Sequence, residues 1–144
     1  MKRSVRCLAF ALTVFMLLAT PAFAAEKGIT RGSDYFASSS VYLYRLSGTS
    51  FEAWFHITAV RGMDELGASS IRIQESEDGE NWTTVQTYLR DTNSHLIAED
   101  TCAHSSYVTY SGTKGMYYRA KIIFFAKNSN GWGSVTEYTA TIKL

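Results

Sequence analysis

Cysteine and proline are scarce in this sequence of 144 residues, and charge of neither sign dominates it. The cysteines are Cys7 and Cys102, and the single proline is Pro21. With 14 basic and 13 acidic side chains, the chain lacks the basic excess typical of proteins that bind nucleic acid or anionic membranes. Its longest apolar run is shorter than the roughly 20 residues that a spanning helix needs. We therefore expect neither nucleic-acid binding nor membrane insertion.

The N-terminal segment has the parts of a secretory signal peptide. Basic residues at positions 2, 3 and 6 precede the apolar run 7–18, and Ala22-Phe23-Ala24 offers the small residues that a signal peptidase recognises. We expect residues 1–24 to be cleaved and the mature chain to be secreted. It would carry 11 basic and 13 acidic side chains, because three of the 14 basic residues lie in the removed segment. Cys102 would be its one cysteine, which excludes an internal disulfide. We expect a monomer, with a dimer linked through Cys102 as the alternative.

Two stretches alternate apolar and polar side chains with the period of a β-strand. In 116–126 the apolar set is Met116, Tyr118, Ala120, Ile122, Phe124 and Ala126, with Arg119 and Lys121 between. In 51–59 it is Phe51, Ala53, Phe55, Ile57 and Ala59. We expect 116–126 to be a central strand and 51–59 to bury one face.

Shorter runs complete an all-β pattern with no segment typical of an ordinary helix. Further strands are expected at 41–46, 71–74, 82–89, 105–110 and 134–144, and loops at 61–69, 91–104 and 127–133. Turn signals recur at about the 8 to 12 residue spacing of sandwich proteins. The prediction is a seven-stranded antiparallel Ig-like or fibronectin type III-like β-sandwich over residues 41–144, with 25–40 as a flexible lead-in. A closed barrel is the alternative.

Several motifs resemble the fibronectin type III module. They are Ile71-Arg72-Ile73 before Glu77-Asp78-Gly79 and Trp82, then Gly112-Thr113, Tyr118, Ala126-Lys127-Asn128, Gly131-Trp132-Gly133 and Ser134. Two features depart from the pattern: Tyr118 lies two residues further from Ala126 than usual, and the alternation puts Trp54 on the polar face. The mature chain also resembles small secreted proteins of Gram-positive bacteria. These resemblances imply a fold and carry no activity.

Catalytic chemistry has one candidate cluster, in the expected loop 91–104. Its members are His95, Glu99, Asp100, Cys102 and His104, which are residue types that zinc or copper accepts. The spacing matches no common zinc signature, and no nearby segment would activate Cys102 as a nucleophile. We therefore predict no enzyme, no metal and no cofactor.

Binding has stronger candidates, because the three expected loops would emerge at one end of a sandwich. Trp132 and Asn130 lie in the loop 127–133, and an exposed tryptophan can anchor a sugar or a protein. Ile123 and Phe125 place apolar side chains on the wet face of 116–126, near Val135, unless Tyr35 and Phe36 cover them. Trp54 is a further candidate, either as an anchor or as a half-buried side chain.

The resulting hypothesis is a secreted, non-enzymatic binding module for an extracellular protein or carbohydrate. The alternative is a secreted effector, such as a bacteriocin-like or inhibitor protein, that acts on other cells.

Overall fold

A computed structural model describes residues 34–144, so the predicted signal peptide and residues 25–33 lie outside the described residues. The regular structure of the described chain is β, apart from short 3-10 segments at Asp34 and at residues 94–96. Its elements are β1 (Phe36–Ser47), β2 (Ser50–Ser76), β3 (Thr83–Leu89), η2 (Ser94–Leu96), β4 (Ile97–Ser111), β5 (Tyr117–Asn128), β6 (Gly131–Tyr138) and β7 (Ile142–Lys143). No helix in 34–144 is long and apolar enough to cross a membrane.

The strand β2 is the spine of the fold, because four of the other strands pair with it. Its first half lies between β1 and β4, and its second half lies between β3 and β5. The register with β4 shifts between Thr58 and Met63, so β2 changes direction there without ending. One strand of 27 residues therefore contributes to both halves of the molecule.

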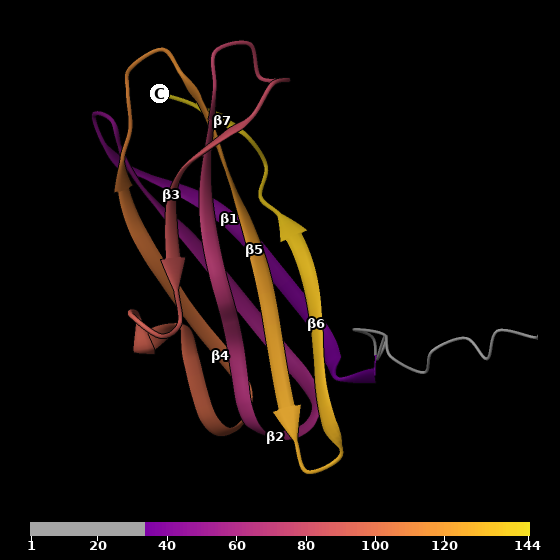
Figure 1. The fold of residues 1–144 in the computed structure, drawn as a ribbon. Coiled ribbons are helices and arrows are strands. Elements are labelled where there is room, and N and C mark those ends of the chain that lie inside the picture. The colour runs from indigo at the N-terminus through magenta and orange to yellow at the C-terminus, as the bar shows by residue number, and fades with distance from the viewer. Residues whose placement is uncertain (1–33) are drawn as a thin grey trace, which may run out of the picture.

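All seven strands belong to one antiparallel sheet, completed by β6 and β7 on β5. The sheet curls, and β1 passes behind β5 and β6 (Figure 1). The all-β class and the seven antiparallel strands are thus confirmed, in a curled sheet that is continuous through β2. The Ig-like or fibronectin type III-like sandwich stays a prediction.

The hydrophobic core fills the inside of the curl. Phe55 on the first half of β2 meets Phe124 on β5 edge to face, with ring centroids 5.5 Å apart. Phe51 contacts Tyr118 in a tilted arrangement, with ring centroids 5.3 Å apart and ring planes inclined by 45°. The core side chains are the alternating sets predicted for 51–59 and 116–126, joined by Met63, Leu66, Ala68, Ile71, Ile73, Leu96 and Val108. The central position of 116–126 is confirmed as β5, which pairs with β2, β6 and β7.

Side chains bridge the two places where strand edges approach without main-chain pairing. On one side, Ser39 of β1 donates a hydrogen bond to Glu137 of β6, and Arg45 donates to the carbonyl of Lys143. On the other side, the Tyr88 hydroxyl of β3 donates to the Thr109 carbonyl of β4, at 2.8 Å. The second seam borders the candidate site described below.

Five sequence-based boundaries were wrong. The expected loop 127–133 is reduced to residues 129–130 between β5 and β6, and the expected last strand 134–144 is divided between β6 and β7. The first strand begins at Phe36 instead of residue 41, so part of the expected lead-in is ordered in β1. The expected loop 61–69 is the middle of β2, where buried Met63, Leu66 and Ala68 continue the inward face. The expected loop 91–104 is the short turn η2 followed by the start of β4. The start of β4 carries many polar side chains because it lies at an edge of the sheet, and its sequence therefore resembles that of a loop.

The residue Tyr35, considered as a cover for the outer face, instead packs inside. It is buried, and its ring lies against Gly133 of β6, where an added Cβ would come within 2.6 Å of a ring carbon. Val135 also faces inward, because it pairs with buried Phe124. The prediction that Val135 extends the outer apolar patch was therefore wrong.

Candidate ligand-binding site

Three aromatic side chains form a row across the outer face of β1, β2 and β4. Tyr42 is the register partner of Trp54, and Trp54 is the register partner of Tyr107. The rings of Tyr42 and Trp54 are parallel within 1°, with centroids 6.3 Å apart. Those of Trp54 and Tyr107 are 4.4 Å apart and inclined by 22°. The rings therefore stand side by side and stack along the direction that crosses the strands.

The stack ends at an open edge, because β4 pairs with β2 on one side only. Trp54 covers the face of the Tyr107 ring that points toward β2. The opposite face of Tyr107 points beyond the edge of β4, and the side chain is 42% exposed. An incoming planar or flat apolar group can extend the stack at this position.

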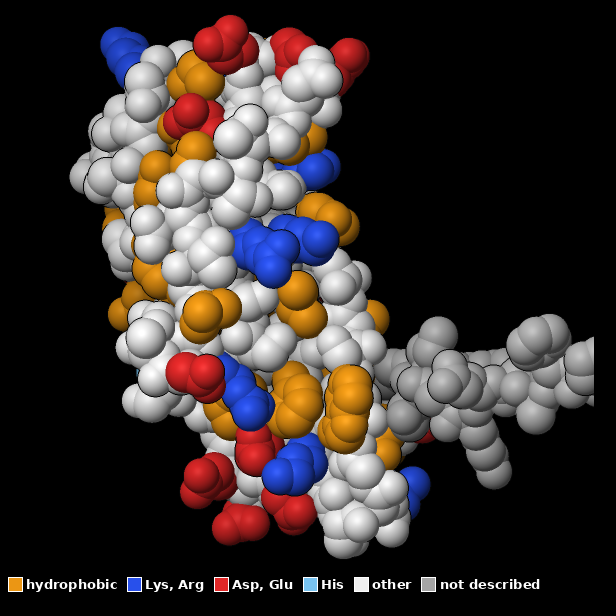
Figure 2. Space-filling view, in the orientation of Figure 1, with side chains coloured by type: hydrophobic (Ala, Val, Ile, Leu, Met, Phe, Trp, Pro, Cys, Tyr) orange, Lys and Arg blue, Asp and Glu red, His pale blue; other side chains and the backbone are white. Residues whose placement is uncertain are grey.

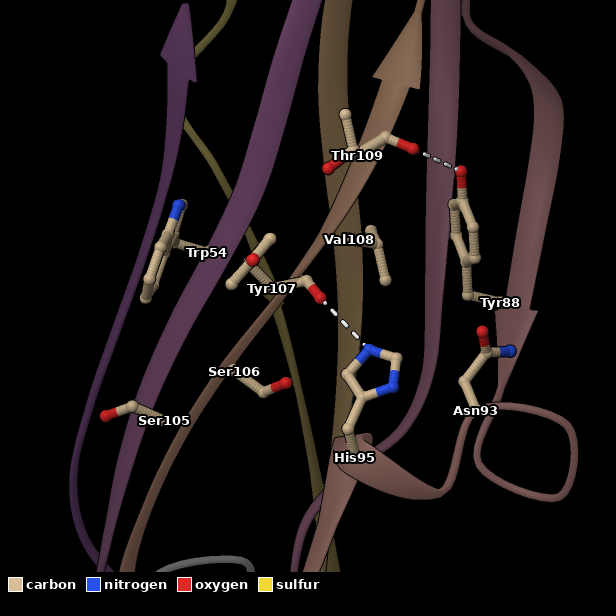
Figure 3. A pocket seen from close by; sticks show the side chains of 9 residues that line it. All are labelled: Trp54, Tyr88, Asn93, His95, Ser105, Ser106, Tyr107, Val108 and Thr109. Atoms are coloured by element: carbon tan, nitrogen blue, oxygen red, sulfur yellow. Dashed lines mark hydrogen bonds between the residues drawn. The ribbon is translucent and has the colours of Figure 1, made fainter. Parts of the chain in front are cut away.

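A groove of about 610 Å³ lies at this edge (Figure 3). We call it the Tyr107 groove. Its volume falls within the range of small-molecule sites. In Figure 3, Tyr88, Asn93 and His95 lie across the groove from the β4 strand. It is lined by Trp54, Tyr88, Asn93, His95, Ser105, Ser106, Tyr107, Val108 and Thr109.

Two side chains occupy the main-chain carbonyls along the open edge. The Nε2 of His95 lies 3.1 Å from the carbonyl oxygen of Tyr107, and the Tyr88 hydroxyl donates to the carbonyl of Thr109. Because a carbonyl only accepts, Nε2 of His95 carries the proton, and in the neutral ring Nδ1 is left as an acceptor. Burial, and then the neighbouring Tyr110, raise the pKa of Tyr88, so its hydroxyl stays a donor at neutral pH.

A hydrogen bond to a neighbouring side chain holds the ring of Trp54 in place. Its Nε1 donates to Oε2 of Glu52 on the same strand, at 2.6 Å. In the adjacent row, Nδ1 of His56 lies 2.7 Å from the Ser105 hydroxyl. The Glu52 bond and the stacking on Tyr42 and Tyr107 thus hold Trp54 in the aromatic wall of the groove, and the cross-strand pair of His56 and Ser105 lies beside it.

The predicted residue Trp132 lies elsewhere, on the outer face of β6. It is 59% exposed and stacks on Phe125, with centroids 6.2 Å apart. The guanidinium of Arg90 lies 4.5 Å from the centroid of the Phe125 ring. Arg90 also pairs with Glu65, at 2.9 Å. Trp132 therefore points outward, as a binding residue would, but it lies on a strand and not at a loop tip.

The remaining predicted residues do not converge with Trp54. Ile123 and Phe125 are half-buried on the outer face of β5. Asn130 is exposed at the β5–β6 turn, where its N–H donates to Oδ1 of Asn128, at 2.9 Å. The candidate residues are thus split between the face that carries Trp54 and the face that carries Trp132.

The histidine and cysteine cluster does not assemble into a metal site. Nε2 of His104 lies 2.9 Å from the carbonyl of His95, and Nε2 of His95 lies near the Tyr107 carbonyl. Both imidazoles therefore bind main chain. Within residues 34–144, no three His, Cys, Asp or Glu side chains are grouped so as to hold a metal ion. Cys102 is exposed and free, and a dimer through it stays a prediction.

Sequence reasoning missed most of the groove, finding only Trp54 and, as a metal-ligand candidate, His95. Tyr42 and Tyr107 point outward from strands whose sequences carry no clear signal of a site. Their alignment with Trp54 depends on the registers of two strand pairs. The alternation in 51–59, which put Trp54 on the outer face, was the available signal. Comparison with known protein families, with curated proteins and with solved structures finds no match.

Proposed function

We propose that the protein is a secreted, non-enzymatic binding module that holds a glycan in the Tyr107 groove. One observation carries the proposal: the stack of Tyr42, Trp54 and Tyr107 ends at an exposed ring in a groove that combines aromatic and polar side chains. The predicted signal peptide supports an extracellular ligand.

The chemistry of the groove suits a sugar. A pyranose ring has an apolar face of C–H groups and a rim of hydroxyls, so it needs an aromatic surface and in-plane hydrogen-bonding partners together. Tyr107 supplies the surface. Asn93, His95 and Ser105 supply amide, imidazole and hydroxyl groups along the same groove.

The same contacts disfavour a peptide that adds a strand to β4. Strand addition needs unoccupied main-chain groups along the edge. Here His95 and Tyr88 already bind the carbonyls of Tyr107 and Thr109. We therefore favour a carbohydrate over a peptide added as a strand.

The fold assignment accompanies this proposal. The Tyr118 hydroxyl accepts a hydrogen bond from the N–H of Thr113, five residues upstream, at 2.7 Å. A tyrosine bonded back to the preceding turn is a feature of Ig-like sandwiches. It supports the proposed Ig-like or fibronectin type III-like relationship, from which the ligand assignment is independent.

The experiment is an array of immobilised oligosaccharides probed with the mature chain and three variants. Tyr107→Ala removes the free ring face, and binding to the best oligosaccharide should weaken at least about tenfold. Tyr44→Ala is the matched control, because Tyr44 is an exposed tyrosine outside the groove. Trp132→Ala tests the earlier loop-end hypothesis.

Loss of binding with Tyr107→Ala and retention with Tyr44→Ala would support the groove. Loss with Trp132→Ala alone would move the site to β6. The alternative hypothesis of a secreted effector predicts growth arrest when purified protein is added to neighbouring species, which a binding module does not require.

A further inference from the structure

Three cations gather on the outer face of the second half of the sheet, on the opposite side of the curl from the Tyr107 groove. Arg72 on β2 is the register partner of Lys121 on β5, and Arg119 lies two residues from Lys121 on the same face. We call these three residues the Arg119 strip. Like charges placed directly opposite each other in an antiparallel pair repel and destabilise the sheet. Their juxtaposition therefore needs a compensating interaction.

No carboxylate within the described residues supplies that compensation. The ion pairs in residues 34–144 join Arg90 to Glu65 and Asp91, and Lys127 to Glu65. None involves the strip. All three cations are partly exposed, so an external anion can reach them.

The guanidinium of Arg119 is held in place by aromatic rings and an amide. It lies 4.4 Å from the centroid of the Trp82 ring and 4.7 Å from that of Tyr138. Its Nε donates to Oε1 of Gln74, at 2.8 Å. The terminal Nη groups make no hydrogen bond within the described residues. An ordered guanidinium with free Nη groups is suited to bidentate binding of a carboxylate or sulfate.

Lys121 shares one of these rings. Its Nζ lies 5.7 Å from the centroid of Tyr138, which is its register partner on β6 and is 48% exposed. Two of the three cations of the strip, Arg119 and Lys121, therefore lie over aromatic rings. Threonines lie on the neighbouring strands. On β3, Thr87 is the register partner of Arg72, and Thr84 is that of Gln74. On β6, Thr136 is the register partner of Ile123.

We propose that the Arg119 strip binds an anionic polysaccharide bearing carboxylate or sulfate groups. The cations match the charges of such a chain, and the rings and threonines match its sugar faces and hydroxyls. This site is separate from the Tyr107 groove, and neither site depends on the other.

The distribution of charge on this face favours a linear chain over a broad surface. In Figure 2, a cluster of Lys and Arg side chains lies at mid-height with no Asp or Glu side chain beside it, whereas the Lys and Arg side chains near the lower end lie among Asp and Glu side chains. A bilayer or a long duplex along this face would bring those acidic side chains against its own negative charge. A chain that crosses the strands at mid-height meets the cations alone.

The test measures binding of the mature chain to heparin, a sulfated and carboxylated polysaccharide, with neutral dextran as the uncharged control. The triple variant Arg72→Gln, Arg119→Gln, Lys121→Gln should bind heparin at least about tenfold more weakly. Lys114→Gln is the matched control, since Lys114 is an exposed cation at the β4–β5 turn, off the strip. Arg119→Lys keeps the positive charge and removes the planar guanidinium that can bind an anion through two N–H groups. It should therefore weaken heparin binding less than the triple variant does.

Thermal unfolding of each variant separates lost binding from lost folding, and the single variant Lys121→Gln serves if the triple variant does not fold. Heparin binding that persists in a folded triple variant would overturn the proposal, as would equal binding to dextran. Equal or tighter binding to phosphatidylserine vesicles or to duplex DNA would also overturn it. Tyr107→Ala should leave heparin binding unchanged, which keeps this test distinct from that of the groove.

Discussion

Asp78 shows how one exposed side chain organises the β2–β3 turn. Its carboxylate accepts hydrogen bonds from the N–H groups of Asn81 and Glu80, each at 2.8 Å, and from the side chains of Asn81 and Ser76. These bonds favour the ionised form, with the Asn81 N–H contributing most. They hold the pKa of Asp78 well below its ordinary value of 3.8.

The first prediction follows from that pKa. Because the folded chain holds the Asp78 proton less tightly than the unfolded chain, the stabilisation is fully present above pH 3.8 and is lost as the pH falls below that value. Asp78→Ala should lower the free energy of unfolding at neutral pH and flatten its decline in acid. Urea unfolding between about pH 5 and pH 2 measures both effects. An unchanged acid profile in the variant would contradict the assignment.

Gly67 is the residue at which β2 has no room for a side chain. Its φ of +155° is one that other residues rarely adopt, and an added Cβ would lie 2.0 Å from the carbonyl oxygen of Leu96. This oxygen belongs to the main chain, which cannot move aside as the end of a flexible side chain can. This position lets β2 pair with the start of β4 and with β5 at the same point.

The second prediction is that Gly67→Ala costs at least about 3 kcal/mol or prevents folding. Gly62→Ala is the control on the same strand, since nothing lies within 4 Å of its added Cβ. Thermal or urea unfolding of the pair compares the two sites. Equal stability of the two variants would show that the Leu96 carbonyl moves aside easily.

At the scale of the element, β2 joins the halves of the molecule through one covalent strand and the packing on its inner face. Phe55 on its first half contacts Phe124 on β5 and lies 5.6 Å from the ring of His104 on β4. The side chain is 1% exposed. The curl therefore depends on contacts that a flat sheet would not make.

The third prediction concerns this contact. Phe55→Ala should lower the free energy of unfolding by about 3–5 kcal/mol, because it leaves a cavity between the two halves. Leu46→Ala on β1 is the control, as Leu46 is 46% exposed. A cost of less than about 1 kcal/mol for Phe55→Ala would mean that the halves do not fold as one unit.

The sequence predicted the elements whose alternation reports burial on one face. The alternating sets in 51–59 and 116–126 are the core of the structure, and the turn at Asp78 was recognised from its residue types. The middle of β2 was read as a loop because Gly62 and Gly67 bracket it. Those glycines mark a change of direction and a close approach, which local sequence does not separate from a strand end.

The candidate site was harder to predict for a physical reason. A cross-strand row depends on register, and the registers of β1 and β4 against β2 arise from tertiary pairing. Trp54 was placed on the outer face correctly, whereas its neighbours Tyr42 and Tyr107 lie in segments that local patterns did not align with it. The expectation that the working surface lies at one loop end therefore included Trp132 and omitted Tyr107.

At the scale of the whole molecule, the hydroxyls of half-buried Tyr88 and buried Tyr118 join separate strands. Burial raises the pKa of Tyr88, Tyr110 and Tyr118 above 10.0, and Glu75 raises the last two further. Tyr118 is fully buried, and its hydroxyl donates to Glu75 of β2 while it accepts from the N–H of Thr113. The hydroxyls of Tyr88 and Tyr118 must stay protonated to donate their hydrogen bonds to the Thr109 carbonyl and to Glu75.

The fourth prediction is alkaline sensitivity. The folded state holds these protons more tightly than the unfolded state, so the stabilisation is complete below pH 10 and declines as the pH rises above it. Tyr118→Phe should reduce this decline and, by leaving Glu75 and the Thr113 N–H unpaired, cost about 1–3 kcal/mol at neutral pH. Urea unfolding against pH, with Tyr44→Phe as control, measures both. A steeper alkaline decline in Tyr118→Phe would contradict this account.

The molecule as a whole presents two outer faces of different chemistry: a row of stacked aromatic rings that ends in the Tyr107 groove, and a mid-sheet strip of cations and rings around Arg119. The most direct test of the central claim is a crystal structure of the mature chain with the oligosaccharide that the array selects. We predict a sugar ring stacked on the free face of Tyr107, within about 4.5 Å of it, with hydroxyls bonded to His95 or Asn93. A sugar seated on Trp132, with the groove empty, would contradict the account.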